Sequence, residues 1–132
     1  MAQTIKIIVE RCNEAKLEVL AELNDSRIAG LVGEALPITS AASIWGDEVY
    51  FGIPVRAGLE NPRDTVEQGD LGYWPEGPAL CIFFGPTPIS SPGEIRPASA
   101  VDVVGRLLGK AQQFRMVRTG DTVKLKEAED IE

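Results

Sequence analysis

The sequence predicts a mainly-β protein, folded as a closed eight-stranded barrel with one main helix and a short helical turn. Its length of 132 residues is typical of one domain. The 13 Gly and 9 Pro residues together make up about 17% of the chain, against roughly 12% in an average globular protein, so the chain turns often. Short segments with strand-like alternation of apolar and polar residues lie between those turns. We expect a closed barrel because closure leaves no unpaired strand edges.

The first two strands are expected to form an antiparallel pair. Residues 4–10 and 16–23 alternate between apolar and polar side chains, apart from an additional apolar Ile8. Asn13 and Glu14 supply a turn between the two segments, which makes a hairpin the simplest connection.

The clearest helix follows this strand pair. Either Asp25 or Ser26 can accept hydrogen bonds from the free N–H groups of a first helical turn. One apolar stripe at helical spacing follows, made of Ile28, Leu31, Val32, Ala35 and Leu36. Pro37 ends the helix. Gly30 and Gly33 each weaken it by roughly 1 kcal/mol relative to Ala, so we expect packing against the end of the barrel to hold it.

The rest of the chain is dominated by strands and loops. Strands are expected at residues 40–45, 48–55, 71–74, 79–84, 98–104 and 122–126. A tight turn at Gly46-Asp47 joins the first two of these into a hairpin. Long loops cover residues 56–64 and 85–97, and loops of this length are often functional. A short helical turn is expected near residues 110–114.

Charge and hydropathy exclude several classes of partner. We interpret residues 1–126 as one barrel domain and residues 127–132 as an acidic tail. No apolar run approaches the roughly 20 residues of a membrane span, and no basic segment precedes an apolar one at the start. The net charge of −7 argues against nucleic acid, which needs clustered Lys and Arg. We therefore expect a cytoplasmic protein that binds neither membrane nor nucleic acid; no pattern predicts an oligomeric state.

The inventory of reactive residues excludes much chemistry. The chain has no His, which rules out His-based triads and zinc sites built on imidazole. Cys81 lies in an apolar run and is interpreted as a buried side chain, whereas Cys12 lies in a turn without an activating neighbour. The segment 69–72 lacks the spacing of a phosphate-binding loop. Oxygen ligands alone, at no recognisable spacing, indicate no metal. The sequence therefore predicts neither a cofactor nor a metal site.

Most aromatic residues gather in three clusters. These are Trp45 with Tyr50 and Phe51, Tyr73 with Trp74, and Phe83 with Phe84. Core packing is the leading interpretation for Phe51 and for at least one residue of the third cluster. Tyr50, Tyr73 and Trp74 stand beside polar or turn residues, which favours a face open to solvent. Amphipathic rings there can line an apolar groove, with core packing as the competing interpretation.

Three segments resemble a family of small, stand-alone cyclophilin-like proteins of prokaryotes. They are residues 45–51 (WGDEVYF), 69–85 (GDLGYWPEGPALCIFFG) and 97–105 (PASAVDVVG). Each segment alone is a weak signal, but the three in this order are specific, and the resemblance is dense from residue 40 to 107. It implies an eight-stranded barrel of the cyclophilin type and no established activity.

Cyclophilins themselves are peptidyl-prolyl isomerases, which lower a barrier of about 18–20 kcal/mol to rotation about a peptide bond. They hold the proline ring in an apolar pocket and direct an arginine at its nitrogen. The corresponding hairpin, residues 41–50, contains no arginine, and Glu48 or Tyr50 stands near the position of the cyclophilin glutamine. The cyclophilin histidine has no counterpart in a chain without His. The resemblance therefore implies the fold without the usual isomerase residues.

The leading functional hypothesis is a module, with weak catalysis or none, that binds a peptide or small molecule in an aromatic groove. The rings expected to form this groove are Trp45, Tyr50, Tyr73, Trp74 and Phe83. Glu48 and Arg63 are expected to be its polar anchors, although a surface ion pair with Asp64 or Glu67 competes for Arg63. One alternative is a proline isomerase that uses a relocated arginine, Arg56 or Arg63. The other is a structural module whose acidic surface docks on a basic protein.

Overall fold

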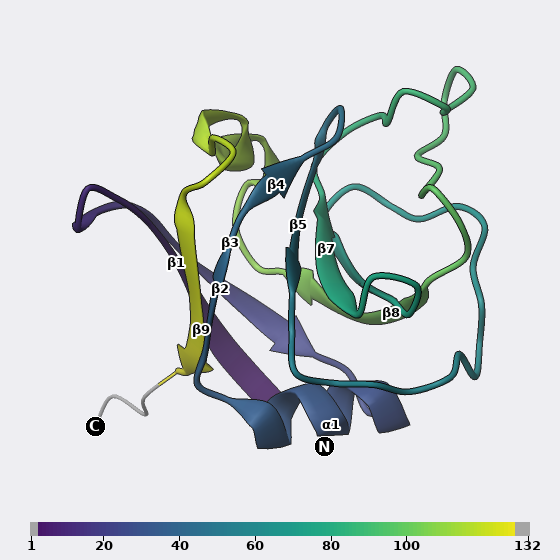
Figure 1. Ribbon diagram of the computed structural model, residues 1–132. Helices are drawn as coiled ribbons and strands as arrows, with labels where there is room; N and C mark the ends of the chain where they lie inside the picture. Colours follow the sequence, from purple (N-terminus) through teal and green to yellow (C-terminus); the bar gives the residue numbers. More distant parts are fainter. Residues whose placement is uncertain (1–2, 129–132) are drawn as a thin grey trace.

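A computed structural model describes residues 3–128 of the protein (Figure 1). Its elements in chain order are β1 (Gln3–Arg11), β2 (Glu14–Leu23), α1 (Arg27–Ala35), β3 (Ile38–Ala41), β4 (Ser43–Ile44), β5 (Glu48–Gly52), β6 (Asp70–Trp74), β7 (Ala79–Phe83), β8 (Asp102–Leu107), the 3-10 helix η1 (Ala111–Met116) and β9 (Thr122–Glu127). The nine strands form one antiparallel sheet in the order β3-β9-β1-β2-β8-β6-β7-β5-β4, curled into a nearly closed barrel. The mainly-β class with one main helix is confirmed.

The described sheet has nine strands rather than eight because the run of residues 38–44 is interrupted at Ala42. β3 pairs with β9, whereas β4 pairs with β5. The two consecutive pieces therefore occupy opposite edges of the sheet. Ala42 donates its backbone N–H to the carbonyl of Asp121 at 2.8 Å and accepts from the N–H of Gly120 at 2.9 Å. Counted as one interrupted strand, residues 38–44 complete an eight-stranded barrel.

Helix α1 lies across one end of the barrel, at the bottom of Figure 1. Of the two predicted caps, the structure shows the action of Ser26, whose Oγ accepts from the backbone N–H of Ala29 at 3.2 Å. Ile28 and Val32 of the predicted apolar stripe are fully buried in the barrel core. The helix ends before Pro37, as expected. Packing on the core thus holds a helix that contains two glycines.

Several boundaries differ from the sequence-based expectations. β8 begins at Asp102, because residues 98–101 belong to the loop that covers the sheet, and it continues to Leu107. β5 ends at Gly52, although Ile53 and Val55 remain buried. The predicted acidic tail overlaps the end of β9 at Glu127, and residues 129–132 lie outside the described residues. No helix within residues 3–128 is long and apolar enough to cross a membrane.

Strand alternation divides the apolar residues into an inner and an outer group. The main core fills the barrel and includes Val49 and Phe51 of β5 together with Phe114 of η1. A second cluster lies on the outer face of β6 and β7. Residues 85–101, here named the covering loop, cover the sheet there together with the segment near Val66. The buried members of the cluster are Val66, Cys81, Phe83, Ile95 and Val101. This outer cluster, covered by loops, positions the candidate site.

Candidate functional site

A pocket of about 250 Å³ opens on the outer face of β5 and β7, beside the outer cluster. It is lined by Trp45, Glu48, Tyr50, Trp74, Cys81, Pro97, Ala98 and Val101. The first four of these residues belong to the set expected from the sequence, and the structure brings them together. The cavity is smaller than the roughly 300–1,000 Å³ of sites for drug-sized ligands, so its size suits one side chain or a small molecule.

The β4–β5 hairpin brings Trp45 and Glu48 to the same side of the sheet. The backbone N–H of each donates to the carbonyl of the other, at 3.0 and 3.1 Å, across the tight turn that the sequence predicted. Gly46 has φ +58°, a conformation that favours glycine. A Cβ at this position would meet Cδ of Pro88 at 2.7 Å. The turn therefore fits closely under the covering loop.

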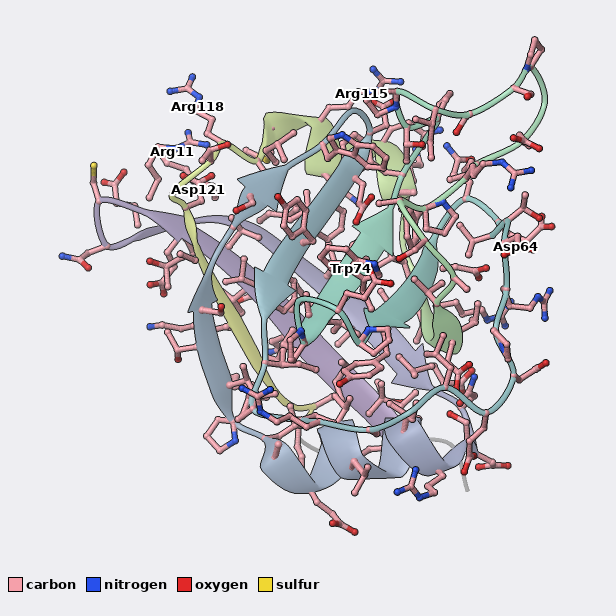
Figure 2. All side chains as sticks on the ribbon, turned by 45° about the vertical axis from the view of Figure 1, so that its right-hand side comes forward. Arg11, Asp64, Trp74, Arg115, Arg118 and Asp121 are labelled. Atoms are coloured by element: carbon pink, nitrogen blue, oxygen red, sulfur yellow. The ribbon has the colours of Figure 1, made fainter. Side chains whose placement is uncertain are left out.

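Tyr50 and Trp74 form one corner of the pocket. Their ring centroids lie 6.5 Å apart and their planes meet at 74°, an edge-to-face arrangement. The indole Nε1 of Trp74 donates to Oγ of Ser99 in the covering loop at 2.6 Å. Beneath the ring, a Cβ on Gly77 would meet Trp74 Cζ3 at 2.6 Å. Figure 2 shows Trp74 in front of the central strands. Its ring lies against the turn at Gly77 and is hydrogen-bonded to the loop at Ser99.

Glu48 is the ionisable carboxyl of the pocket and is only 5% exposed. Its Oε1 is buried and has no hydrogen-bond partner among residues 3–128. Burial raises the pKa of Glu48 to about 7, and a hydrogen-bonding contribution from the Cys81 thiol partly opposes the shift. Burial, with the nearby Glu48 charge, raises the pKa of Cys81 well above its usual value. Cys81 is therefore a neutral thiol and a poor nucleophile at neutral pH.

Two expected groove residues, Tyr73 and Phe83, do not line the pocket. Tyr73 is fully buried in the main core, where its hydroxyl donates to the carbonyl of Val55 at 2.7 Å and accepts from the N–H of Ala57 at 3.2 Å. The predicted solvent-open face for Tyr73 is therefore wrong. Adjacent strand residues point to opposite faces, so Tyr73 and Trp74 cannot both face the groove. Phe83 is fully buried in the outer cluster, beside the pocket.

Arg63 is exposed, and its side chain is not among those that line the pocket. Its backbone instead pairs with Val101, with N–H to carbonyl distances of 2.8 and 3.1 Å. This bridge fastens the covering loop next to the cavity. In the described part of the chain, the lining residues include no arginine.

Sequence reasoning missed four lining residues. Cys81 was correctly interpreted as buried, but its place opposite Tyr50 depends on the pairing of β5 with β7. Pro97, Ala98 and Val101 come from the covering loop, whose path carries no periodic signal. The only available signal was the family segment 97–105, which marked this stretch without showing where it lies.

Buried polar side chains anchor the two loops around the site. The carboxylate of Asp102 accepts from the backbone N–H groups of Glu60 and Asn61, both at 2.9 Å. Thr87 donates its hydroxyl to the carbonyl of Arg96, which closes the covering loop on itself. Both anchors are at most 5% exposed. Among residues 3–128, no group of three His, Cys, Asp or Glu side chains could hold a metal ion.

The barrel and its outer pocket define a protein of cyclophilin-like architecture, and comparison with known proteins agrees. The chain belongs to the cyclophilin-like family, whose model matches residues 3–126. It is similar to the hypothetical protein AF2241 from Archaeoglobus fulgidus, whose solution structure gives a TM-score of 0.78 at 39% identity. That similarity covers 96% of this chain and 95% of the archaeal one. No curated protein matches. The family resemblance of the sequence is confirmed.

Proposed function

We propose that the protein is a binding module that takes a peptide segment or a small molecule into the outer pocket. The observation that carries this proposal is the convergence of Trp45, Tyr50 and Trp74 around one cavity. Aromatic rings offer large apolar contact areas at a small entropic cost, and they recur in binding sites for that reason. The anchored loops support a preformed pocket, which lowers the cost of binding further.

The composition of the pocket favours binding over isomerase catalysis. Proline isomerisation of the cyclophilin kind relies on a cation that favours the twisted peptide bond over the planar one. The described lining residues supply one carboxyl, one thiol, aromatic rings and apolar groups. The indole N–H of Trp74 already donates to Oγ of Ser99. These groups can enclose a ligand and accept a hydrogen bond from it.

The proposal is tested by titration, because both tryptophans of the chain line the pocket. Their fluorescence and their two indole N–H signals in NMR spectra therefore report on this site. We expect proline-containing peptides or small-molecule fragments to shift signals of the lining residues first. Trp74→Ala should weaken binding about tenfold or more, as loss of a central aromatic contact usually does.

Leu20→Ala is the matched control, since Leu20 lies outside the pocket on β2 and is 43% exposed. It should leave binding unchanged. Signal changes confined to residues outside the pocket, or equal affinity in Trp74→Ala and wild type, would contradict the proposal.

A further inference from the structure

We propose that the pocket recognises an organic cation, namely a primary or methylated ammonium group on a short alkyl chain, with Glu48 as its counter-charge. This inference rests on the proposed function and narrows it to one ligand chemistry. It follows from three features of the pocket: a buried carboxyl whose Oε1 has no partner among residues 3–128, an aromatic corner, and the scarcity of other charges.

The carboxyl of Glu48 is the first feature. A buried polar group without a partner is destabilising, and such groups in folded proteins call for a specific explanation. Glu48 is 5% exposed, lines the cavity, and has an Oε1 without a partner among residues 3–128. Its neighbour Cys81 is only a weak donor. A ligand that brings a charged N–H group, or a positive charge alone, compensates this carboxyl when it is ionised.

The aromatic corner is the second feature. Tyr50 and Trp74 meet at 74° with centroids 6.5 Å apart, and Trp45 lines the same cavity. Aromatic faces carry negative charge density, so they attract a cation that lies within about 6 Å of the ring centroid. Aromatic side chains gathered in this way recognise alkylated ammonium groups in other proteins. Carboxyl and rings thus favour the same ligand charge.

The charges around Glu48 are the third feature. From β5 and β7 the neighbouring groups are Tyr50 and Cys81, and from the covering loop they are Pro97, Ala98 and Val101. None of these lining residues carries a positive charge. Nη2 of Arg115 lies 3.7 Å from Oδ2 of Asp47, so the charge of this arginine is paired with the carboxylate next to Glu48 in the sequence. An anionic ligand would meet an uncompensated carboxyl, and the net charge of −7 adds a long-range attraction for cations.

Cation binding is then linked to the protonation of Glu48. Burial raises the pKa of Glu48 to about 7 in the free protein. A bound cation stabilises the ionised form and lowers this pKa, so binding releases a proton near neutral pH. For a cation of fixed charge, the affinity should rise about tenfold between pH 6 and pH 8, following the ionised fraction of Glu48. Cys81 stays protonated in this range and does not contribute.

The experiment uses four-carbon probes that differ in charge. n-Butylammonium, 1-butanol and butyrate are titrated into the full chain, with tryptophan fluorescence and the indole N–H signals as readouts. We expect n-butylammonium to bind at least about tenfold more tightly than the other two. Tetramethylammonium, whose charge is independent of pH, tests the linkage. Its affinity should rise with pH in the wild type and lose that rise in Glu48→Gln, whereas Glu18→Gln on the exposed face of β2 should keep it.

The outcomes separate this inference from the proposed function. Equal binding of 1-butanol and n-butylammonium, or an unchanged pH dependence in Glu48→Gln, overturns the cation site while leaving a ligand pocket. If no ammonium probe binds while proline peptides still shift the pocket signals, the cation site is likewise overturned and the ligand pocket remains. A capped lysine, Nα-acetyl-lysine amide, identifies the source of the cation. Binding equal to n-butylammonium indicates the side chain of a partner protein, and weaker binding indicates a free amine.

Discussion

Glu48 owes its unusual environment to parts of the chain that are distant in sequence. Alternation along β5 correctly directs it to the outer face of the barrel, together with Tyr50. An outward carboxylate is normally solvated, but Glu48 is only 5% exposed. Its burial results from a loop about fifty residues further along the chain, which ends at Val101 and covers this face. No sequence pattern around residue 48 predicts that contact.

Burial of Glu48 makes folding stability depend on pH. Its pKa is raised from the ordinary 4.5 to about 7 in the folded state. Between these two pH values Glu48 is ionised in the unfolded chain but still protonated in the folded protein, so the free energy of unfolding falls as pH rises. The decrease ends above about pH 7, where Glu48 is ionised in both states. Glu48→Gln lacks this loss, so its stability relative to wild type should increase by about 2 kcal/mol between pH 5 and pH 8. Urea unfolding at both pH values measures the difference.

Glu18→Gln is the control for this pH dependence, because Glu18 is exposed on β2 and changes the net charge equally. Its stability relative to wild type should be the same at both pH values. A Glu48→Gln curve parallel to that of wild type would show that Glu48 is ionised normally.

Gly77 should control the position of the Trp74 ring. A methyl group there would approach Cζ3 of Trp74 to 2.6 Å, so Gly77→Ala should push the indole toward the covering loop and disturb its hydrogen bond to Ser99. We expect a shifted Trp74 indole N–H signal and weaker ligand binding. Gly58→Ala is the matched control, since a Cβ at Gly58 meets nothing within 4 Å. Identical indole signals in both variants would contradict this role.

At the level of strands and helices, local patterns predicted much of the structure. The capped helix, the first hairpin and the turn at Gly46 follow from residue types at fixed spacings, and the structure confirms them. The candidate site was half predicted. Tyr50 and Trp74 line the pocket, whereas Tyr73 faces the core because successive side chains of a strand point to opposite faces of the sheet. The lining residues from the covering loop could not be predicted, because an irregular segment has no periodicity to interpret.

An ion pair fastens the β1–β2 hairpin to the start of β9. Arg11 donates Nε and Nη2 to the two carboxylate oxygens of Asp121, at 2.9 and 2.8 Å, and Nη2 also reaches the carbonyl of Met116. The backbone N–H of Arg118 donates to the same carboxylate at 2.8 Å. Figure 2 shows Arg11, Arg118 and Asp121 gathered on one side of the barrel. Asp121 thus links three segments.

Asp121→Asn should therefore destabilise the protein by about 2 kcal/mol, as loss of charged hydrogen bonds typically does. The Arg11 guanidinium lowers the pKa of Asp121, so its contribution is present above the ordinary value of 3.8 and is lost as pH falls below it. Glu14→Gln is the control, because its contact with Lys16 is exposed and should contribute less than about 0.5 kcal/mol. Equal unfolding midpoints for the two variants would rule out this linking role.

At the level of the whole molecule, membership of the family accounts for the barrel fold but does not identify the chemistry of the pocket. The cyclophilin-like family model covers residues 3–126, and the described lining of the pocket includes one carboxyl and no positively charged side chain. We expect a protease-coupled assay with proline-containing peptides to give the uncatalysed rate. Arg63→Ala should leave that rate unchanged, because its side chain lies outside the pocket. An acceleration lost in Arg63→Ala would instead establish the isomerase alternative.

The interruption at Ala42 has a mechanical consequence. β4 has two residues and, within the described sheet, one neighbour, β5, so the shortest ladder of the barrel lies next to Trp45. This ladder pairs only Ser43 with Tyr50 and Ile44 with Val49, so it contributes few of the backbone hydrogen bonds at this edge. Ala42 itself is fixed by its two backbone hydrogen bonds to residues 120–121. The turn after β4 is held by the loop instead, since Asp47 donates its backbone N–H to the carbonyl of Pro86 at 3.0 Å and accepts from the N–H of Phe84 at 2.9 Å. The place of Trp45 at the rim of the cavity therefore depends more on these loop contacts than on the strand ladder.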